Sequence, residues 1–334
     1  MSYFKEKLKI ESKIKKIRIV VAVIVTAILL IACIISAFIP IPTWKYRVAI
    51  PKINKRVEGE MRLHFVDVGQ GDATIIELPD GKTMLIDGGN NDVTTEKNIM
   101  RYLHALKINT IDYLVVTHAD SDHCGALDVV LKYKEVKNAY IPKTSANVNK
   151  EYAAFYAALQ KEDCNVTYSS REVILNHDGE FPYTLSFLSP YTLELEEGEE
   201  ETKENNASSA VIWLDYQGVS TLFAADAPME LEENLMRDDK LNLFSERGVQ
   251  LSSTEILKVA HHGSKYSSGL EFLQYLNVKT SIISCGEKNV HGHPTQEVLT
   301  NLDEVGAKIY RTDEDGSVMI SVSKTGEYYV KNIK

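Results

Sequence analysis

The stretch Thr117-His118-Ala119-Asp120-Ser121-Asp122-His123 decides how this chain is interpreted. It places two imidazoles and two carboxylates within six residues, directly after the apolar run 113–116. A strand that ends in a turn would aim these four side chains into one space, where ionised carboxylates need a compensating cation. The sequence therefore predicts a metal site at the end of a strand, rather than a polar loop that faces water.

Four further segments combine apolar runs with Gly, Asp or His, on both sides of this motif. They are Phe65-Val66-Asp67-Val68-Gly69-Gln70-Gly71-Asp72-Ala73, Met84-Leu85-Ile86-Asp87-Gly88-Gly89, Leu222-Phe223-Ala224-Ala225-Asp226 and Leu257-Lys258-Val259-Ala260-His261-His262-Gly263-Ser264. With the central motif they resemble the metallo-β-lactamase superfamily, in the variant whose motif has Asp at its second position. The set is most similar to the hydrolase domain of ComEC-type DNA-uptake competence proteins, and more distantly to choline-phosphate esterases. The resemblance covers about residues 60–325.

The resemblance implies an α/β fold, an αββα metallo-β-lactamase-type sandwich with its active site along one edge of the two sheets. Periodicity by itself predicts only a mixture of helices and strands. Strands are expected at 61–68, 73–78, 83–87, 183–188, 209–216, 219–225 and 255–260, with a further one that begins at Tyr113. Helices are expected at 126–133, 150–161 and 229–236, near Thr295, and after a cap at Thr95.

The resemblance also implies two divalent metal ions. One ion would be held by His118 and Asp120, the other by Asp122 and His123, with Asp226 as a bridge and either His261 or His262 completing the second site. If Leu257 and Val259 face inward, strand alternation favours His261 as the ligand. His262 is the alternative ligand and would otherwise contact substrate.

Further roles are expected around these ligands. The expected catalytic residues are Asp122, Asp87 and His293, and the expected substrate-binding residues are His262, Ser264, Asn206 and Lys265. Asp87 would accept a hydrogen bond from a ligand and fix its orientation. His293 would donate to a substrate phosphate or protonate a leaving group, and a plain structural turn around it stays open.

One departure from the superfamily concerns the first metal. Many members supply another His between the central motif and the bridging Asp, and here His177 is the candidate, in what reads as a surface turn. The ComEC-like pattern has an Asn-rich segment at this place instead, seen here at 205–209. The first site is then rich in oxygen ligands, which suits Mn²⁺ as well as Zn²⁺.

Hydrolysis is the reaction that such a centre implies. Two cations a few ångström apart lower the pKa of a bridging water to give a hydroxide and stabilise the oxygens of an in-line displacement. The leading hypothesis is a phosphodiesterase or nuclease, with a phosphoester and possibly DNA as substrate. The alternatives are a non-phosphate hydrolase, such as a lactonase or β-lactamase-like enzyme, and a catalytically silent metal-binding scaffold.

The N-terminal part predicts a membrane anchor. Residues 19–40 form 22 positions without a charge, enough to cross a roughly 30 Å hydrocarbon core as a helix. Seven Lys or Arg within residues 1–18 predict a cytoplasmic tail. The expected order is therefore a basic tail (1–18), a transmembrane helix (19–40), a linker (41–59) and an extracellular hydrolase domain (60–334), in a single-pass protein of the cell membrane.

Two alternatives to an uncleaved anchor stay open. A cleaved signal peptide would have a shorter apolar region and a small-x-small site. A lipoprotein would begin at Cys33, although the residues after it are unusually apolar. The other cysteines, Cys124, Cys164 and Cys285, are widely spaced and indicate neither a disulfide framework nor a Cys-x-x-Cys metal site.

Charge bears on the substrate. Residues 1–56 hold 12 of the 37 Lys and Arg but 2 of the 47 Asp and Glu, so 25 basic and 45 acidic residues remain, a net charge of −20. Such a domain repels a polyanion unless it has a local basic path. Lys258, Lys265 and Lys288 are the candidates for that path, with solvated surface lysines as the alternative. The acidic run 194–204 is expected to be a solvated loop.

Overall fold

The computed structural model describes residues 2–39, 41–191 and 205–333. The acidic run 194–204 lies outside these ranges. The chain divides into two units, residues 1–49 and 50–334, and each is described by itself.

The N-terminal unit is a long helix, charged in its first half and apolar in its second, followed by a short turn of 3₁₀ helix. The helix α1 spans Ser2–Phe38, and the 3₁₀ helix η1 spans Ile41–Tyr46. The uncharged part of this helix, residues 19–38, extends about 30 Å, and large apolar side chains such as Ile24 and Leu29 are more than half exposed. The helix is a candidate membrane span by length and composition.

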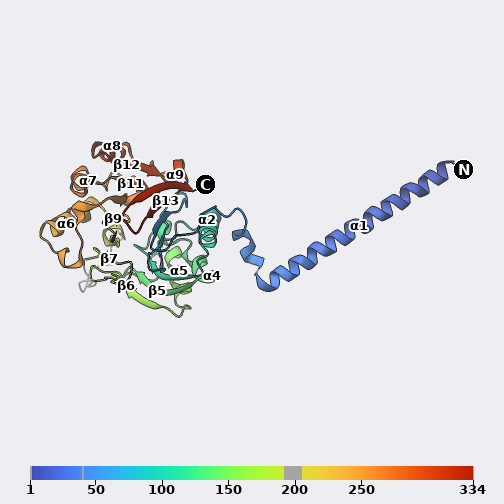
Figure 1. Cartoon of the computed structure of the whole chain (residues 1–334), viewed down its shortest axis with the longest axis horizontal. Coiled ribbons are helices and arrows are strands. Elements are labelled where there is room, and N and C mark those ends of the chain that lie inside the picture. Colours follow the sequence, from blue (N-terminus) through green and yellow to red (C-terminus); the bar gives the residue numbers. More distant parts are fainter. Residues whose placement is uncertain (1, 40, 192–204, 334) are drawn as a thin grey trace. The chain divides into compact units, whose positions relative to one another are not determined.

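The C-terminal unit contains two mixed sheets with helices outside them, so the predicted αββα sandwich is confirmed (Figure 1). The first sheet has the order β14-β13-β1-β2-β3-β4-β5-β6 and the second β12-β11-β10-β9-β8-β7. The strands are β1 (Met61–Phe65), β2 (Thr74–Glu77), β3 (Thr83–Ile86), β4 (Thr110–Val115), β5 (Glu135–Ile141), β6 (Asn165–Tyr168), β7 (Tyr183–Phe187), β8 (Ile212–Tyr216), β9 (Val219–Phe223), β10 (Ile256–Lys258), β11 (Thr280–Ile283), β12 (Lys308–Arg311), β13 (Ser317–Val322) and β14 (Tyr328–Ile333).

The helices form two groups. Those that accompany the first sheet are α2 (Val93–Ala105), α3 (Ser121–Cys124), α4 (Leu127–Tyr133) and α5 (Lys150–Leu159). Those that accompany the second sheet are α6 (Met229–Lys240), α7 (Leu270–Leu276) and α8 (Gln296–Glu304). The short helix α9 (Thr312–Asp315) connects β12 to β13. The described residues of this unit also form the 3₁₀ turns η2 (Asn205–Ser208), η3 (Ser245–Arg247), η4 (Leu251–Ser253) and η5 (Ala260–Gly263).

Apolar residues cover both faces of the second sheet. Ile212 and Phe223 belong to the core between the two sheets, where Phe223 stacks on Phe65 at a ring-centroid distance of 6.2 Å. Their chain neighbours Trp213 and Leu222 belong to a second core beneath α6, α7 and α8. Because successive residues of a strand point to opposite faces, a sheet covered on both sides needs continuous apolar runs.

Strand direction determines where the polar motifs gather. The strands β3 and β4 are parallel neighbours in the first sheet, and β9 and β10 are parallel neighbours in the second. The central motif follows the carboxyl end of β4, and Asp87 follows that of β3. Asp226 and the His261-His262 doublet follow the carboxyl ends of β9 and β10 in the same way.

Some predicted boundaries were wrong, for reasons of local geometry. Helix α2 is capped by Asp92, whose Oδ1 accepts hydrogen bonds from the backbone N–H groups of Thr94 and Thr95 at 2.8 and 3.0 Å. Thr95 itself is buried, and its hydroxyl donates to the carbonyl of Val68. The strands predicted at 219–225 and 255–260 end earlier, at Phe223 and Lys258, because the chain then turns sharply.

Candidate metal centre

The loops that hold the polar motifs contain several residues with a strained backbone. Asp87, Ala225, His261 and His262 all have left-handed backbone conformations, with φ of 59°, 48°, 50° and 54°. Such conformations are uncommon for residues other than Gly, and they persist only where the surrounding structure imposes them. The strand alternation that favoured His261 ends with β10 and does not extend into this turn.

Glycines let the loops around the central motif pack backbone against backbone. The N–H of Gly89 donates to the carbonyl of Asp72, and the N–H of Gly125 donates to that of Gly89. A β-carbon at Gly71 would lie 2.4 Å from the carbonyl oxygen of Asp122, and one at Gly125 would lie 2.3 Å from the nitrogen of Asn91. These contacts fix the relative positions of the three loops.

The carboxylate of Asp226 lies among four histidines. Its Oδ1 is 3.2 Å from Nε2 of His123 and 3.8 Å from Nε2 of His262. Its Oδ2 is 3.9 Å from Nε2 of His118 and 3.6 Å from Nε2 of His261. The two oxygens therefore face different pairs of imidazoles.

Among the groups of possible ligand atoms that contain His123, two lie at the centre of the site. One contains His118, His123 and Asp226, and the other contains Asp122, His123 and His262, with all atoms of a group within 4.8 Å of one another. Nε2 of His262 lies 3.3 Å from Oδ2 of Asp122. Nε2 of His118 lies 3.6 Å from Oδ2 of Asp120, which is on the exposed side of the centre.

The two histidines of the doublet differ in burial. The side chain of His262 is 1% exposed, whereas that of His261 is 27% exposed. Nδ1 of His262 lies 2.9 Å from the carbonyl of Ser284, which leaves Nε2 directed at Asp122 and Asp226. In this geometry His262 joins the compact ligand group and His261 borders it on the open side.

The buried ligand atoms fit a divalent cation. Nε2 of His118, His123 and His262 and Oδ1 of Asp226 are buried without a hydrogen-bond partner. Leaving such atoms unpaired is costly, and imidazole nitrogen with carboxylate oxygen is a donor set that binds divalent metals. In each of these three rings Nδ1 contacts an oxygen atom and therefore carries the proton of the neutral imidazole. The lone pair is then on Nε2, which points into the centre.

Asp87 connects the central motif to the strand beside it. Its carboxylate accepts hydrogen bonds from the backbone N–H and the hydroxyl of Thr117, at 2.8 and 2.7 Å, and from Nδ1 of His123 at 2.8 Å. The side chain is 1% exposed. Asp87 thus lies where the expected orienting contact to a ligand would be made.

The electrostatics of the centre show an excess of negative charge. Burial opposes protonation of His262, but Asp226 and Asp72 outweigh it and raise its pKa to about 10. Burial likewise opposes protonation of His123, yet Asp226 and Asp87 raise its pKa well above the usual value. Burial would raise the pKa of Asp122, but His262 and His123 lower it to about 2. Without metal, protons on the imidazoles compensate the carboxylates, and cations would replace those protons.

Two buried residues of the centre were missed as site residues. Nζ of Lys258 lies 2.7 Å from Oδ2 of Asp72, and Oδ1 of Asp72 lies 3.4 Å from Nδ1 of His262. Lys258 is 2% exposed, so the expectation of a surface path through Lys258 was wrong. Its position between Leu257 and Val259, in a strand with both faces covered, was the sequence signal for burial.

The other expected side chains lie at different depths. The ring of His293 is 5.6 Å from that of His261, and burial together with His261 and His262 lowers the pKa of His293 to about 4. Ser264 is buried, and its hydroxyl accepts a hydrogen bond from the backbone of Tyr266. Lys265 is exposed, whereas Asn206 is partly buried and has an unpaired Oδ1.

His177 lies away from the ligand groups. Its Nδ1 is 3.7 Å from Oδ2 of Asp80, in the turn between β2 and β3, and its ring stacks on Tyr183. That turn is at the opposite end of β3 from Asp87. The structure thus brings no third histidine from this segment to the first ligand group.

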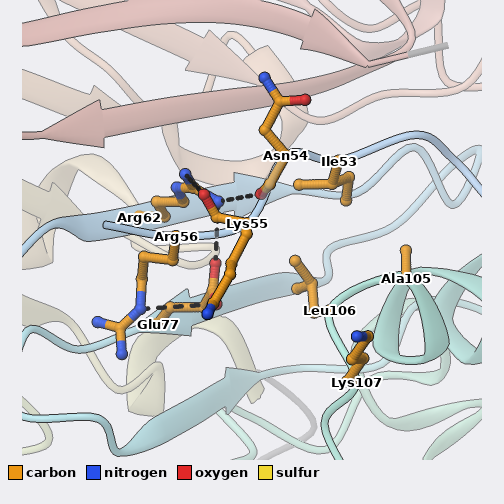
Figure 2. A pocket seen from close by; sticks show the side chains of 9 residues that line it. All are labelled: Ile53, Asn54, Lys55, Arg56, Arg62, Glu77, Ala105, Leu106 and Lys107. Carbon is orange, nitrogen blue, oxygen red and sulfur yellow. Dashed lines mark hydrogen bonds and ion pairs between the residues drawn. The ribbon is translucent and has the colours of Figure 1, made fainter. Parts of the chain in front are cut away.

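A cationic cavity also lies at that opposite edge (Figure 2). It has a volume of about 420 Å³ and is lined by Ile53, Asn54, Lys55, Arg56, Arg62, Glu77, Ala105, Leu106 and Lys107. Arg62 pairs with Glu60 at 2.8 Å, and Arg56 lies 3.7 Å from Glu77. The cavity is lined by residues at the start of β1 and the end of β2. Its basic side chains are therefore not beside the metal ligands and do not form the expected basic path.

Comparison with known proteins identifies the family. The model of the metallo-β-lactamase superfamily matches residues 66–287, which is more than half of the chain. The chain belongs to the metallo-β-lactamase superfamily. This membership supports a metal-dependent hydrolase and agrees with the candidate ligands above.

Curated relatives narrow the resemblance further. The chain is 32% identical over 276 residues to ComE operon protein 3 of Bacillus subtilis (strain 168), covering 78% of this chain and 33% of that protein. It is 26% identical over 269 residues to competence protein ComA of Neisseria gonorrhoeae, covering 80% of this chain and 33% of that protein. The chain thus spans about a third of the length of these relatives, and the predicted similarity to ComEC-type competence proteins is confirmed.

The doublet can be tested by metal content. We expect His262→Ala to lower occupancy of one ion, because it removes a buried nitrogen directed at Asp122, while His261→Ala keeps both ions. Elemental analysis of the purified variants after incubation with Zn²⁺ or Mn²⁺ measures this. Retention of both ions by His262→Ala, with loss in His261→Ala, would contradict the assignment.

The shared position of Asp226 gives a second prediction. Asp226→Ala should remove both ions, since each of its oxygens faces a different pair of imidazoles, whereas Asp120→Ala should weaken one ion and leave the other nearly intact. Isothermal titration with Mn²⁺ separates the two sites. Equal loss of both ions in Asp120→Ala would show that the ligands are divided differently.

Proposed function

We propose that this protein is a membrane-anchored, metal-dependent phosphodiesterase that can act on nucleic acid. The observation that carries the proposal is the position of Asp226 among buried, unpaired imidazole nitrogens. The similarity to competence proteins supports the nucleic-acid part of the proposal. Both the substrate class and the anchoring are inferences beyond family membership.

The proposed division of ligands follows the two carboxylate oxygens. One ion would be held by His118, Asp120 and Asp226, and the other by Asp122, His123, Asp226 and His262. Since His177 is remote, the first site is poor in nitrogen, and the metal is proposed to be Zn²⁺ or Mn²⁺. Two bound cations would lower the pKa of a water and stabilise the oxygens of an in-line displacement.

Residues around the ions would orient the metal-binding histidines and contact the substrate. Asp87 holds the ring of His123 in place through Nδ1, and Asp122 is the carboxylate nearest to His262. His261 and His293 border the ligands side by side, where a phosphate oxygen could accept a hydrogen bond. We assign Asn206, Ser264 and Lys265 to the surrounding substrate region, with Ser264 acting through its turn.

The charge of the domain limits the DNA proposal. The net charge beyond residue 56 is −20, and the burial of Lys258 leaves Lys265 and Lys288 as the exposed lysines near the doublet and His293. A long polyanion would therefore bind through few contacts. A short or single-stranded substrate suits this centre better than a long duplex.

A substrate panel tests the proposed function. The full chain in detergent, supplied with Mn²⁺ or Zn²⁺, is given single-stranded DNA, a generic phosphodiester, phosphorylcholine and a β-lactam. We expect hydrolysis of the phosphodiester, and cleavage of DNA that falls moderately between low and physiological salt, because few contacts would hold the DNA. Replacing both Lys265 and Lys288 with Ala should raise KM for DNA more than it lowers kcat.

Hydrolysis of the β-lactam alone would reject the proposed phosphodiesterase activity. Salt-independent activity on the small phosphodiester, without DNA cleavage, would reject the proposed nuclease activity.

The membrane proposal has its own test. Seven basic residues precede the span and five lie between Lys45 and Arg56, so we propose a cytoplasmic N-terminus and an extracellular domain. Protease added to intact protoplasts should digest the chain beyond Arg56, while a cytoplasmic marker stays intact. Protection of the domain, or a mature N-terminus at Cys33, would contradict an uncleaved anchor in this orientation.

A further inference from the structure

The buried pair of Lys258 and Asp72 is a feature of the centre that hydrolysis by two cations does not itself require. Nζ of Lys258 lies 2.7 Å from Oδ2 of Asp72 and donates to the carbonyl of Val259 at 2.8 Å. The side chains of Lys258 and Asp72 are 3% and 7% exposed. A buried ion pair contributes little net stability compared with apolar residues of similar size, so its presence calls for another role.

Asp72 could itself be a metal ligand. Its carboxylate, that of Asp226 and the ring of His262 offer atoms within 4.8 Å of one another. One oxygen of Asp72 is taken by the ammonium group of Lys258. The other lies 3.4 Å from Nδ1 of His262, on the side of the ring away from Asp122. The ammonium group thus holds Asp72 behind the imidazole.

Charge compensation points the same way. Five carboxylates gather at the centre, those of Asp72, Asp87, Asp120, Asp122 and Asp226. Lys258 compensates one of them, and the four that remain match the charge of two divalent cations. Without the ammonium group, Asp72 would be a fifth anionic competitor for the same ions.

We infer that Lys258 is a positioning residue: it keeps Asp72 out of the metal coordination and directs it to Nδ1 of His262. This inference rests on the proposed two-metal site. The hydrogen bond of Nδ1 goes to the carbonyl of Ser284, and the carboxylate of Asp72 beside it adds a negative charge that makes the ring a stronger ligand. Removing that charge weakens metal binding. The pair therefore sets how tightly the ions are held and which groups hold them.

Metal affinity of the full chain, measured by competition with a chelator, tests this inference without any substrate. Asp72→Asn should weaken binding of one ion by roughly 10–100-fold. Lys258→Met should tighten binding, on the order of tenfold, because Asp72 is then free to coordinate. In the Asp72→Asn background, Lys258→Met should have little further effect on affinity, because the competing carboxylate is absent.

The control is Lys134→Met, which removes another buried lysine, whose Nζ donates to the carbonyl of Ile108. It should lower the melting temperature without changing metal affinity. If Asp72→Asn and Lys258→Met behave like this control, the pair is only structural and the inference is overturned. Asp72→Asn is nearly isosteric, so unchanged metal affinity in this variant overturns the inference even if Lys258→Met does not fold. If the wild-type chain binds no divalent ion, the proposed function fails along with the inference.

Discussion

The alignment of the two sheets is the constraint on which the centre depends. Asp226 follows a strand of the second sheet, whereas His118 and His123 follow a strand of the first. The distances of 3.2–3.9 Å between Asp226 and these rings exist only while the sheets keep their relative position. The core between the sheets maintains that position, and it includes the stacked rings of Phe65 and Phe223. Phe223 is only three residues before Asp226 in the chain. Packing and the candidate metal site are thus two aspects of one arrangement.

Much of this arrangement could be predicted from the sequence. The apolar runs before each polar motif are strands because both faces of the sheets are covered, and continuous hydrophobicity is a strong signal for such strands. Parallel strands then bring the motifs of each sheet to one edge, which is why Asp87 meets His123 and Asp226 lies beside the His261-His262 doublet. The packing of the two sheets against each other was predicted from the family resemblance. The periodicity of apolar residues carries no information about it.

The remaining details depend on the backbone. Strand alternation could not distinguish His261 from His262, because both residues adopt left-handed conformations that no pattern of hydrophobicity reports. Lys258 was expected near the surface because lysine is rarely buried without a partner, and its partner Asp72 is 186 positions earlier in the chain. Similarly, Asp92 rather than Thr95 caps α2, since Thr95 is needed to satisfy a buried carbonyl. In each case a long-range contact overrides a local preference.

The close backbone packing at Gly71, Gly89 and Gly125 has a thermodynamic consequence. Because these loops leave no room for a β-carbon, their conformation is fixed when the domain folds rather than when an ion arrives. Ion binding then costs little conformational entropy, because the loops are already ordered. Most of the binding free energy therefore adds to the free energy of unfolding. In the metal-free chain, protons on His123 and His262 have to compensate the carboxylates instead. The cations would therefore act as part of the domain's stability, coupling the supply of metal in the surroundings to the lifetime of the folded protein.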